Sequence, residues 1–449
     1  MPVLTFLYSL LWRVVPLLAP ALPRSGKLGK ALRGRRGGAR ALADWARRAR
    51  DPARPLVWYH AASVGEGRQA EAVLRGLAAA RPAWQLAYTF SSPSAERWAA
   101  SLPVDVAAYV PCDTAAETGR ALEAVQPTAL VFSATDLWPE LVRQAHGRGV
   151  KVAVTSATLA PTSSRRSLLA RSLLGPAYAV LDRVGAIDEE DARRLAELGV
   201  PRERIAVTGD TRHDAACARL AALSPGAPHL KALRGDGNDA RPVVVAGSTW
   251  PADERVLMPA LRGAFDRGAR FRLVVAPHEP TAEHVAALEA KLDYCMPQGM
   301  RRVRLSALLG ARDSQPLGTR DSASRNADAI VVDVVGVLAE LYTMASVAFV
   351  GGGFHTKGLH SVIEPAAAGV PVLFGPRWQG SRDARLLLEA GGARAAGGRG
   401  ELSAALSEWL QNESARAVAA AAARAVVERG RGAADRSVRL LIDLVERAS

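Results

Sequence analysis

Glu66 stands between Gly65 and Gly67, directly after a run of strand-forming residues at 55–63. The two glycines allow the backbone to turn sharply and to approach a ligand closely, so that the carboxylate stands at the opening of a helix. A general base that takes a proton from a hydroxyl group needs this placement. A helix cap is the alternative, and position alone favours it, because acidic residues are common in the first turn of helices.

A second candidate segment is SATDLWPELV at 133–142, which follows an apolar strand. Asp136 and Trp138 offer a charge and an aromatic face on one loop, a combination that suits the positioning of a polar ring such as a sugar. As an alternative, Trp138 precedes Pro139 and packs under the next helix. The residue types alone leave these two interpretations evenly matched.

The third segment, 347–376, ends a strand with the glycines 351–353 and continues with Lys357, His360 and Ser361. Glycine N–H groups, a helix N-terminus and a cation together form an anion site suited to a nucleotide phosphate, and Glu364 would then accept hydrogen bonds from ribose hydroxyls. Ser361 and Glu364 also have the spacing of a capping box, which needs no ligand. Capping does not require the glycines, the lysine or the histidine, so we favour the binding site.

Two series of short apolar strands, separated by helical segments, must position these residues. The first series is expected at 55–63, 84–92, 106–111, 129–135, 150–158 and 178–187. The second series is expected at 241–248, 270–278, 329–334, 347–353 and 370–376. Alternation of this kind predicts parallel sheets with helices on both faces, and ligands then bind where the strands end.

The predicted fold class is therefore α/β: two Rossmann-like domains facing across a cleft, with an N-terminal membrane-anchoring segment. The expected divisions are an anchor and basic segment (1–50), a first Rossmann-like domain (51–225), a linker (226–240), a second Rossmann-like domain (241–430) and a C-terminal helix (431–449). A chain of 449 residues is longer than single-core domains usually grow, which agrees with two domains.

The composition limits the partners. A net charge of +14 is typical of proteins that meet nucleic acid, anionic membranes or acidic substrates. No nucleic-acid motif accompanies the charge, so we expect no nucleic-acid partner. Cys112, Cys217 and Cys295 are too scattered for a metal cluster or a disulfide framework, and we expect no metal and no cofactor.

The N-terminus favours the membrane. Residues 4–22 are almost continuously apolar, but Arg13, Pro16 and Pro20 interrupt the run, which favours an interfacial anchor over a full span. Basic residues without any acidic neighbour follow: Arg24, Lys27, Lys30, Arg33, Arg35, Arg36 and Arg40. This pattern attracts anionic lipid headgroups and predicts the cytoplasmic face of the inner membrane. A cleaved signal peptide would carry its basic cluster before the apolar run. We expect residues 1–40 to be removable without unfolding.

Six motifs carry a family resemblance: HAASVGEGRQ (60–69), FSATDLWPELV (132–142), GDTRHD (209–214), AGSTWPADE (246–254), VVAPHE (274–279) and the glycine segment 351–376. In this order and spacing the chain resembles, over nearly its whole length, the Kdo transferase family, whose members attach 3-deoxy-D-manno-octulosonic acid (Kdo) from CMP-Kdo to the lipid A precursor. The resemblance implies a metal-independent inverting enzyme of the GT-B fold in which Glu66 matches the catalytic base. It also implies that 51–225 is the acceptor domain and 241–430 the nucleotide-sugar donor domain.

The resemblance also assigns the other site residues. Glu364 matches the ribose-binding carboxylate, and the remaining residues fall into an acceptor and sugar group and a nucleotide group. The acceptor and sugar group is Ser63, Gly65, Asp136, Trp138 and Arg212. The nucleotide group is Ser248, Thr249, His278, Gly352, Gly353, Lys357, His360, Ser361 and Glu364. Because CMP-Kdo and the lipid A precursor are both anionic, a basic cleft beside a basic membrane-facing patch would attract both. The anionic inner-membrane surface is a further expected partner of that patch.

Three positions depart from the family pattern. Ala134 replaces an acidic residue, Pro277 replaces an arginine that would meet phosphate, and Trp250 replaces a histidine, a form that we associate with one branch of the family. Lys357 or Arg212 would have to compensate for the arginine. The alternatives are another GT-B enzyme that uses a UDP- or GDP-sugar with a membrane lipid acceptor, and a non-enzymatic basic membrane-binding protein.

Overall fold

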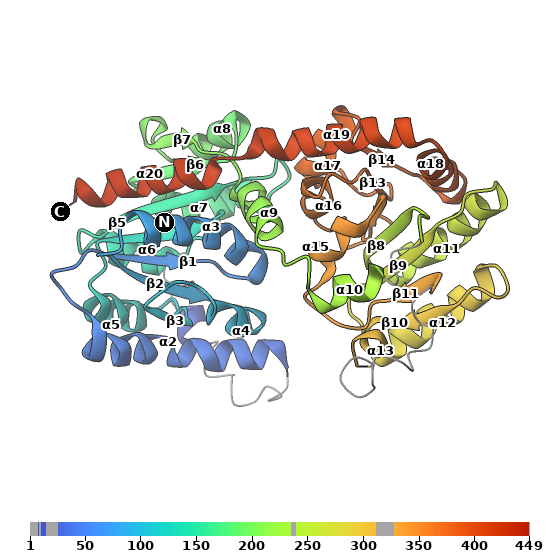
Figure 1. Ribbon diagram of the computed structural model, residues 1–449. Helices are drawn as coiled ribbons and strands as arrows, with labels where there is room; N and C mark the ends of the chain where they lie inside the picture. The colour runs from blue at the N-terminus through green and yellow to red at the C-terminus, as the bar shows by residue number, and fades with distance from the viewer. Residues whose placement is uncertain (1–7, 9, 15–25, 235–238, 311–326, 449) are drawn as a thin grey trace. The chain divides into compact units, whose positions relative to one another are not determined.

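The computed structural model describes residues 8, 10–14, 26–234, 239–310 and 327–448. The chain divides into two compact units, Met1–Ala215 with Gly430–Ser449, and Ala216–Arg429 (Figure 1). The sequence placed a linker at 226–240, but helix α10 (Pro228–Arg234) occupies part of that range and buries Leu230 and Leu233 in the second unit.

The first unit is built on a seven-stranded sheet in the order β3-β2-β1-β4-β5-β6-β7, with every neighbouring pair parallel. Its strands are β1 (Leu56–His60), β2 (Gln85–Phe90), β3 (Val106–Tyr109), β4 (Ala129–Ser133), β5 (Lys151–Ala157), β6 (Arg183–Ala186) and β7 (Ile205–Val207). Its helices are α2 (Lys27–Ala49), α3 (Val64–Ala80), α4 (Glu96–Ala99), α5 (Ala115–Val125), α6 (Pro139–His146), α7 (Leu168–Ala179), α8 (Glu189–Glu197), the start of α9 (Thr211–Ala221) and α20 (Ala433–Glu446), with the short turns η2 (Pro93–Ala95), η3 (Ser164–Arg166) and η4 (Arg202–Arg204).

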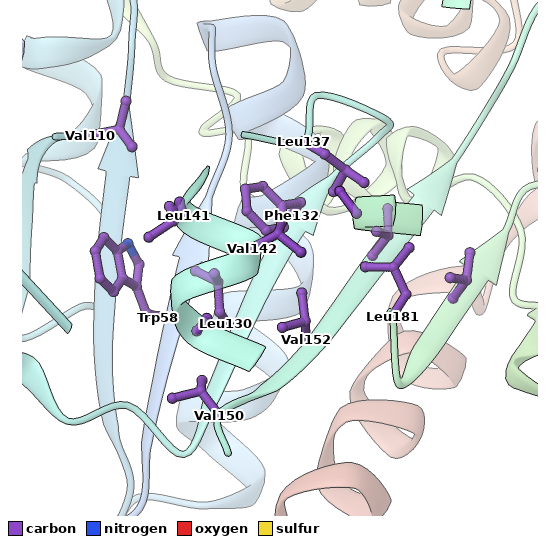
Figure 2. Packing of buried hydrophobic residues seen from close by; sticks show 14 of the residues in the cluster. Trp58, Val110, Leu130, Phe132, Leu137, Leu141, Val142, Val150, Val152 and Leu181 are labelled. Atoms are coloured by element: carbon purple, nitrogen blue, oxygen red, sulfur yellow. The ribbon is translucent and has the colours of Figure 1, made fainter. Parts of the chain in front are cut away.

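Helices cover both faces of this sheet because successive strand residues point to opposite sides. Trp58, Leu130 and Phe132 belong to one buried cluster with α5 and α6 (Figure 2). Val57 and Tyr59 belong to the other cluster, with α3 and α20. The C-terminal helix α20 thus completes the core of the first unit, although it follows the second unit in sequence.

The second unit repeats this plan with the strand order β10-β11-β9-β8-β12-β13-β14, again parallel throughout. Its strands are β8 (Val243–Thr249), β9 (Arg272–Pro277), β10 (Arg302–Arg304), β11 (Ala329–Val331), β12 (Val347–Val350), β13 (Val372–Phe374) and β14 (Ala393–Ala395). Its helices, besides α10, are α11 (Pro251–Asp266), α12 (Ala282–Cys295), α13 (Leu305–Gly310), α15 (Leu338–Leu341), α16 (Ile363–Ala367), α17 (Arg382–Glu389), α18 (Arg399–Gln411) and α19 (Glu413–Gly430), with the turn η5 (Tyr342–Met344).

The prediction of two parallel α/β sheets is confirmed, and its errors fall on short edge strands. The strands β7, β10 and β14 were not predicted, because three-residue edge strands carry too little apolar pattern. The strand expected at 178–187 is shorter than predicted, since Tyr178 lies in α7 and only Arg183–Ala186 pair with β5.

The N-terminal region differs from a simple tail. Within residues 1–40, helix α2 buries Leu32 and Ala39 in the first unit, so removal of this segment would take away core packing, which argues against the expectation that the deletion leaves the fold intact. Its basic residues are mostly exposed, but Arg35 is 4% exposed and is not available to a lipid headgroup.

Most of the predicted anchor at 4–22 lies outside the described residues, which include only Tyr8 and 10–14 of it, in helical conformation. No helix among the described residues is long and apolar enough to cross a membrane.

Candidate active site

The predicted site residues lie where each sheet reverses its strand order. In the first unit the order reverses between β1 and β4, which precede Glu66 and Asp136; in the second it reverses between β8 and β12, which precede Trp250 and the glycine loop. Ligands of open α/β sheets bind outside the carboxyl ends of the strands at such switch points. Each unit therefore presents a candidate half-site of its own.

Backbone strain marks the same edges. Ala134 after β4 (φ 58°), Ser156 in β5 (φ 48°) and Ser248 in β8 (φ 53°) adopt left-handed conformations that non-glycine residues rarely occupy. Each such residue costs roughly 1–3 kcal/mol and persists where the surrounding structure imposes it, commonly at functional sites. Ala134 is one of the departures from the family pattern, so an alanine here accepts a backbone conformation that it does not favour.

Glu66 lies in the first turn of α3, where its carboxylate and its backbone are both held. Its Oε2 accepts a hydrogen bond from the Ala62 N–H (2.8 Å), and its own N–H donates to Oγ of Ser63, the N-cap residue (3.5 Å). The capping interaction that the sequence left open is therefore present. The side chain is only half-buried, however, so capping does not remove the carboxylate from a ligand's reach.

The surroundings of Glu66 favour its proton-bound form more than water does. Burial raises the pKa of Glu66, and the negative charge of Asp136 raises it further, while the backbone N–H groups of Ala62 and Ser63 and the charge of Arg165 lower it. The balance is a raised pKa, which is the direction that makes a carboxylate a more effective base near neutral pH.

Asp136 is paired with an arginine that the sequence did not single out. Nη2 of Arg165, in η3 after β5, lies 3.3 Å from Oδ1 of Asp136. Burial raises the pKa of Asp136, and Arg165 and Arg35 oppose that rise. One cation and two carboxylates, Asp136 and Glu66, thus influence one another at this edge of the sheet.

Trp138 lies in an aromatic and cationic cluster rather than simply beneath a helix. The Arg35 guanidinium stacks 3.9 Å from the Trp138 ring and 4.2 Å from the Trp12 ring. The indole N–H of Trp138 donates to Nε2 of the buried His60 (3.0 Å), at the end of β1. Trp138 therefore connects the N-terminal segment to the strand that leads into the Glu66 turn.

A buried polar network connects helix α3, which begins at the Glu66 turn, to neighbouring segments of the first unit. Gln69 of α3 accepts a hydrogen bond from Ser133 and donates to Asp210 (3.3 Å), while Thr211 donates to the backbone carbonyl of Gln69 (3.0 Å). Arg212, assigned to acceptor binding, forms an ion pair with Asp210 through Nε (2.8 Å). Three sequence motifs thus meet here, and Arg212 belongs to the first unit.

In the second unit the glycines permit backbone contacts that no side chain would allow. A Cβ on Gly351 would lie 2.2 Å from the carbonyl oxygen of Ser248, and one on Gly353 would lie 2.4 Å from the Gly375 nitrogen. Gly352 has φ +94°. The ends of β8, β12 and β13 therefore approach one another closely at this loop. The expected phosphate site of glycine N–H groups is not open as predicted, because Gly351 donates to the Gly247 carbonyl (2.9 Å) and Gly352 donates to a carboxylate.

Asp253, which the sequence analysis did not assign, holds this loop in place. Its buried carboxylate accepts hydrogen bonds from the N–H groups of Trp250 (2.9 Å), Gly352 (2.8 Å) and Phe354 (3.0 Å). The next residue, Glu254, is equally buried; it accepts from Thr249 (3.1 Å) and pairs with His284 and Lys291. Thr249, assigned to nucleotide binding, is therefore engaged within the protein.

The predicted nucleotide residues His278, Lys357 and His360 surround the Trp250 ring. His278 stacks on Trp250 with 4.6 Å between ring centroids, and the Lys357 ammonium lies 4.8 Å from the same ring. Trp250 donates its indole N–H to Nε2 of His360 (2.9 Å). His355, which was not predicted, stacks on Trp250 at 4.4 Å.

The capping box that the sequence allowed at 361–364 is absent. Val362, not Ser361, is the N-cap of α16, and no side chain caps this helix. Ser361 is exposed, and Glu364 stands in the first turn, where its charge contributes, after burial, to a raised pKa of Tyr342. The binding roles of Ser361 and Glu364 stay predictions. A capping box, however, does not explain the spacing of these two residues.

The residues that sequence reasoning missed, Arg165, Asp253, His355 and His60, act through contacts between separate elements. Asp253, His60 and His355 do fall inside quoted motifs (AGSTWPADE, HAASVGEGRQ and the glycine segment 351–376), which was the available signal. Among the described residues no three of His, Cys, Asp and Glu are grouped as metal ligands would be.

Two parallel seven-stranded sheets, each with polar residues at its switch point, define the fold class: a two-domain α/β protein of the GT-B kind. The crystal structure of UDP-GlcNAc 2-epimerase from Neisseria meningitidis bound to UDP-GlcNAc matches with a TM-score of 0.58 and 12% identity, covering 88% of this chain and 100% of that one. A glycosyltransferase from Rickettsia africae matches with a TM-score of 0.55 and 10% identity, covering 88% and 98%. Such identities show the fold alone.

The sequence comparisons are more specific. A family model for 3-deoxy-D-manno-octulosonic-acid transferases (kdotransferases) matches residues 33–215. The 3-deoxy-D-manno-octulosonic acid transferase of Bordetella pertussis is 31% identical over 407 residues, which cover 88% of this chain and 89% of the relative. The enzyme of that name from Haemophilus influenzae is 26% identical, covering 87% of both. The chain belongs to the Kdo transferase family and is a glycosyltransferase.

Proposed function

We propose that the protein transfers Kdo from CMP-Kdo to a lipid A precursor in lipopolysaccharide biosynthesis, with inversion at the anomeric carbon. The observation that carries the chemical part of this proposal is the Glu66 carboxylate, held at the switch point of the first sheet beside Asp136 and Arg165, in a chain of this family. Its half-buried position lets an acceptor hydroxyl approach.

The transfer is a single displacement. Glu66 takes the proton of the acceptor hydroxyl while the hydroxyl oxygen forms a bond to the anomeric carbon of Kdo. The bond from that carbon to the CMP phosphate oxygen breaks, and CMP leaves with the electron pair. Attack from the face opposite the leaving group inverts the configuration, and no covalent enzyme intermediate is needed.

The second unit supplies groups that suit the departing CMP. The Lys357 ammonium is a cation that can stabilise the developing negative charge and so lower the barrier to its release, and His360 can donate a hydrogen bond to a phosphate oxygen. The N–H groups of Gly351 and Gly352 are already donated to the Gly247 carbonyl and to Asp253. Glu364 follows in the first turn of α16, where it can accept from ribose hydroxyls. No arginine is needed at 277 if these groups share the phosphate charge.

A pH profile tests the assignment of Glu66. Asp136→Asn removes a charge that raises the pKa of Glu66 and leaves the opposing cation Arg165 unpaired, so both effects lower that pKa. Because turnover is lost as Glu66 becomes protonated, the acid limb of kcat should move to lower pH. Arg165→Gln should move it to higher pH. If the acid limb of the kcat profile does not shift in either variant, Glu66 is not the general base.

We also propose that the N-terminal segment attaches the protein to the cytoplasmic face of the inner membrane. Tyr8 and Trp12 turn inward, to Asp113 (2.6 Å) and Arg35, whereas Leu10, Leu11 and Val14 are 44%, 56% and 47% exposed. Lys27, Lys30, Arg36 and Arg40 of α2 are also exposed. Apolar side chains that insert, together with cations that meet anionic headgroups, are the two signals that stable interfacial attachment needs.

Replacing Leu10, Leu11 and Val14 together with serine should weaken binding to vesicles that contain anionic lipid by roughly tenfold or more, from the apolar area lost. Flotation with vesicles measures the bound fraction. A double serine variant at Leu168 and Leu169, which are 83% and 67% exposed on α7, is the matched control for lost surface leucines. Equal loss in both variants, or in neither, would refute a membrane role specific to the N-terminal segment.

An assay with CMP-Kdo and a lipid A precursor, followed by mass analysis, tests the activity. We expect the acceptor to gain the mass of one or more Kdo units as CMP is released. Thermal stabilisation by CMP, but not by UDP or GDP, should accompany it. Stabilisation by UDP or GDP instead, without transfer of Kdo, would favour the alternative enzyme class.

A further inference from the structure

The Trp250 ring lies at the centre of a group of three imidazoles. It is nearly coplanar with His360 (interplanar angle 10°), and its indole N–H donates to Nε2 of His360 across 2.9 Å. His278 stacks on both members of this pair, 4.6 Å from Trp250 and 4.3 Å from His360. His355 stacks on Trp250 at 4.4 Å, with an interplanar angle of 11°. The two rings of the Trp250–His360 pair are therefore fixed relative to each other by a hydrogen bond and by stacking.

This hydrogen bond selects one form of His360. An indole N–H can only donate, so Nε2 of His360 must be the unprotonated nitrogen that accepts. The proton of the neutral ring is then on Nδ1, which has no hydrogen-bond partner among the described residues. Burial, together with the nearby His278 and His355, lowers the pKa of His360 to about 4, so the ring is neutral at physiological pH.

We propose that Trp250 is a positioning residue of the donor site, which holds His360 as a neutral ring with its N–H on Nδ1 and thereby prepares it to donate to a phosphate oxygen of the nucleotide sugar. The backbone supports the placement, because His360 donates its own N–H to the Gly351 carbonyl (3.1 Å), at the start of the glycine loop. The part of this inference that concerns the nucleotide-sugar phosphate rests on the proposed function, whereas the part that concerns the tautomer of His360 does not.

A neutral donor suits this site. A protonated His360 would carry an N–H on Nε2 that faces the indole N–H of Trp250, so the pair excludes the doubly protonated ring. The positive charge for the phosphate is left to Lys357, and His360 supplies a directed hydrogen bond. Trp250 itself is covered by imidazoles, so its role is to orient His360 rather than to bind the donor directly.

The tautomer can be measured on the full chain without any substrate. With histidine labelled with nitrogen-15 and the His360 signals assigned through His360→Gln, we expect Nδ1 to have the chemical shift of a protonated nitrogen and Nε2 that of an unprotonated one. Trp250→Phe keeps an aromatic ring in the stack but removes the N–H, so the protonated nitrogen should change to Nε2, the form that imidazole side chains prefer in water. Protonation of Nε2 in the unmodified protein would overturn the proposal.

Kinetics test the role. Trp250→Phe should raise KM for CMP-Kdo roughly tenfold with kcat little changed, because one hydrogen bond made equally in the bound and transition states is weakened. Trp250→His, which restores an N–H donor, should recover most of the loss. In a His360→Ala background, Trp250→Phe should have no further effect on KM. An additive loss in that background would refute positioning through His360, whereas absence of transfer by the unmodified protein would refute the proposed function and leave the tautomer result standing.

Discussion

Glu66→Gln should lower turnover by about a hundredfold or more while the affinity for the donor hardly changes. Glutamine preserves the shape of the side chain and an oxygen that can still accept from the Ala62 N–H, so the turn before α3 should survive. What the variant loses is the carboxylate that accepts the acceptor proton. Turnover and melting temperature, measured on one preparation, separate this effect from unfolding.

A helix cap alone predicts a different result. Loss of the charge from the first turn of a helix costs only about 0.3–1 kcal/mol of stability, and turnover per folded molecule would then be nearly normal. Glu71→Gln is the matched control, because Glu71 lies on the same helix and pairs with Arg75 at the surface. Near-normal turnover of Glu66→Gln with a lowered melting temperature would reject the catalytic assignment and the proposed mechanism with it.

The sequence was sufficient to place those candidate site residues that directly follow a strand. Glu66 follows β1 and the glycines follow β12, so strand pattern and glycine spacing were enough to place them at the carboxyl edges of the sheets. Arg165 was not predictable in this way. It meets Asp136 only because β4 and β5 are neighbours in the sheet, and nothing in the spacing of 29 positions between the two residues indicates an ion pair.

The basic N-terminal run shows a second limit of sequence reasoning. The seven basic residues spread over positions 24–40 predicted a solvated segment beside a membrane. Most of the basic residues of this run that the structure describes are exposed. Arg35 is not, because its guanidinium lies against the rings of Trp12 and Trp138, 126 positions apart in the chain. Composition cannot show which cation of a run will be buried; that depends on an aromatic partner supplied by another element.

The two units use a similar device at their switch points. In the first, Trp138 donates its indole N–H to His60 Nε2; in the second, Trp250 donates to His360 Nε2. In both, an indole fixes the tautomer of a histidine near a strand end. His60 uses its other nitrogen within the protein, at Thr89 (3.0 Å), whereas Nδ1 of His360 has no partner among the described residues. The same pairing therefore serves structure in one unit and is available for a ligand in the other.

Asp253→Asn should destabilise the second unit by roughly 2–4 kcal/mol, because charge-assisted hydrogen bonds are lost and a buried N–H is left facing another donor. The carboxylate accepts from Trp250 and Gly352 through Oδ2 and from Phe354 through Oδ1. An amide has only one oxygen, so in either orientation its NH₂ group faces at least one backbone N–H. The loop that carries Gly352 should loosen, and CMP affinity should fall with it.

Calorimetry of the full chain, with and without CMP, measures both effects. Since the chain has two units, the expected change is a lower temperature for the transition that CMP stabilises, with the other transition unmoved. Asp266→Asn is the control on the same helix: Asp266 is exposed, pairs with Arg262, and should change stability by no more than about 0.5 kcal/mol. If Asp253→Asn melts like the control and binds CMP normally, the glycine loop does not depend on this carboxylate, and the donor site would have to be held by the close backbone contacts of Gly351 and Gly353 alone.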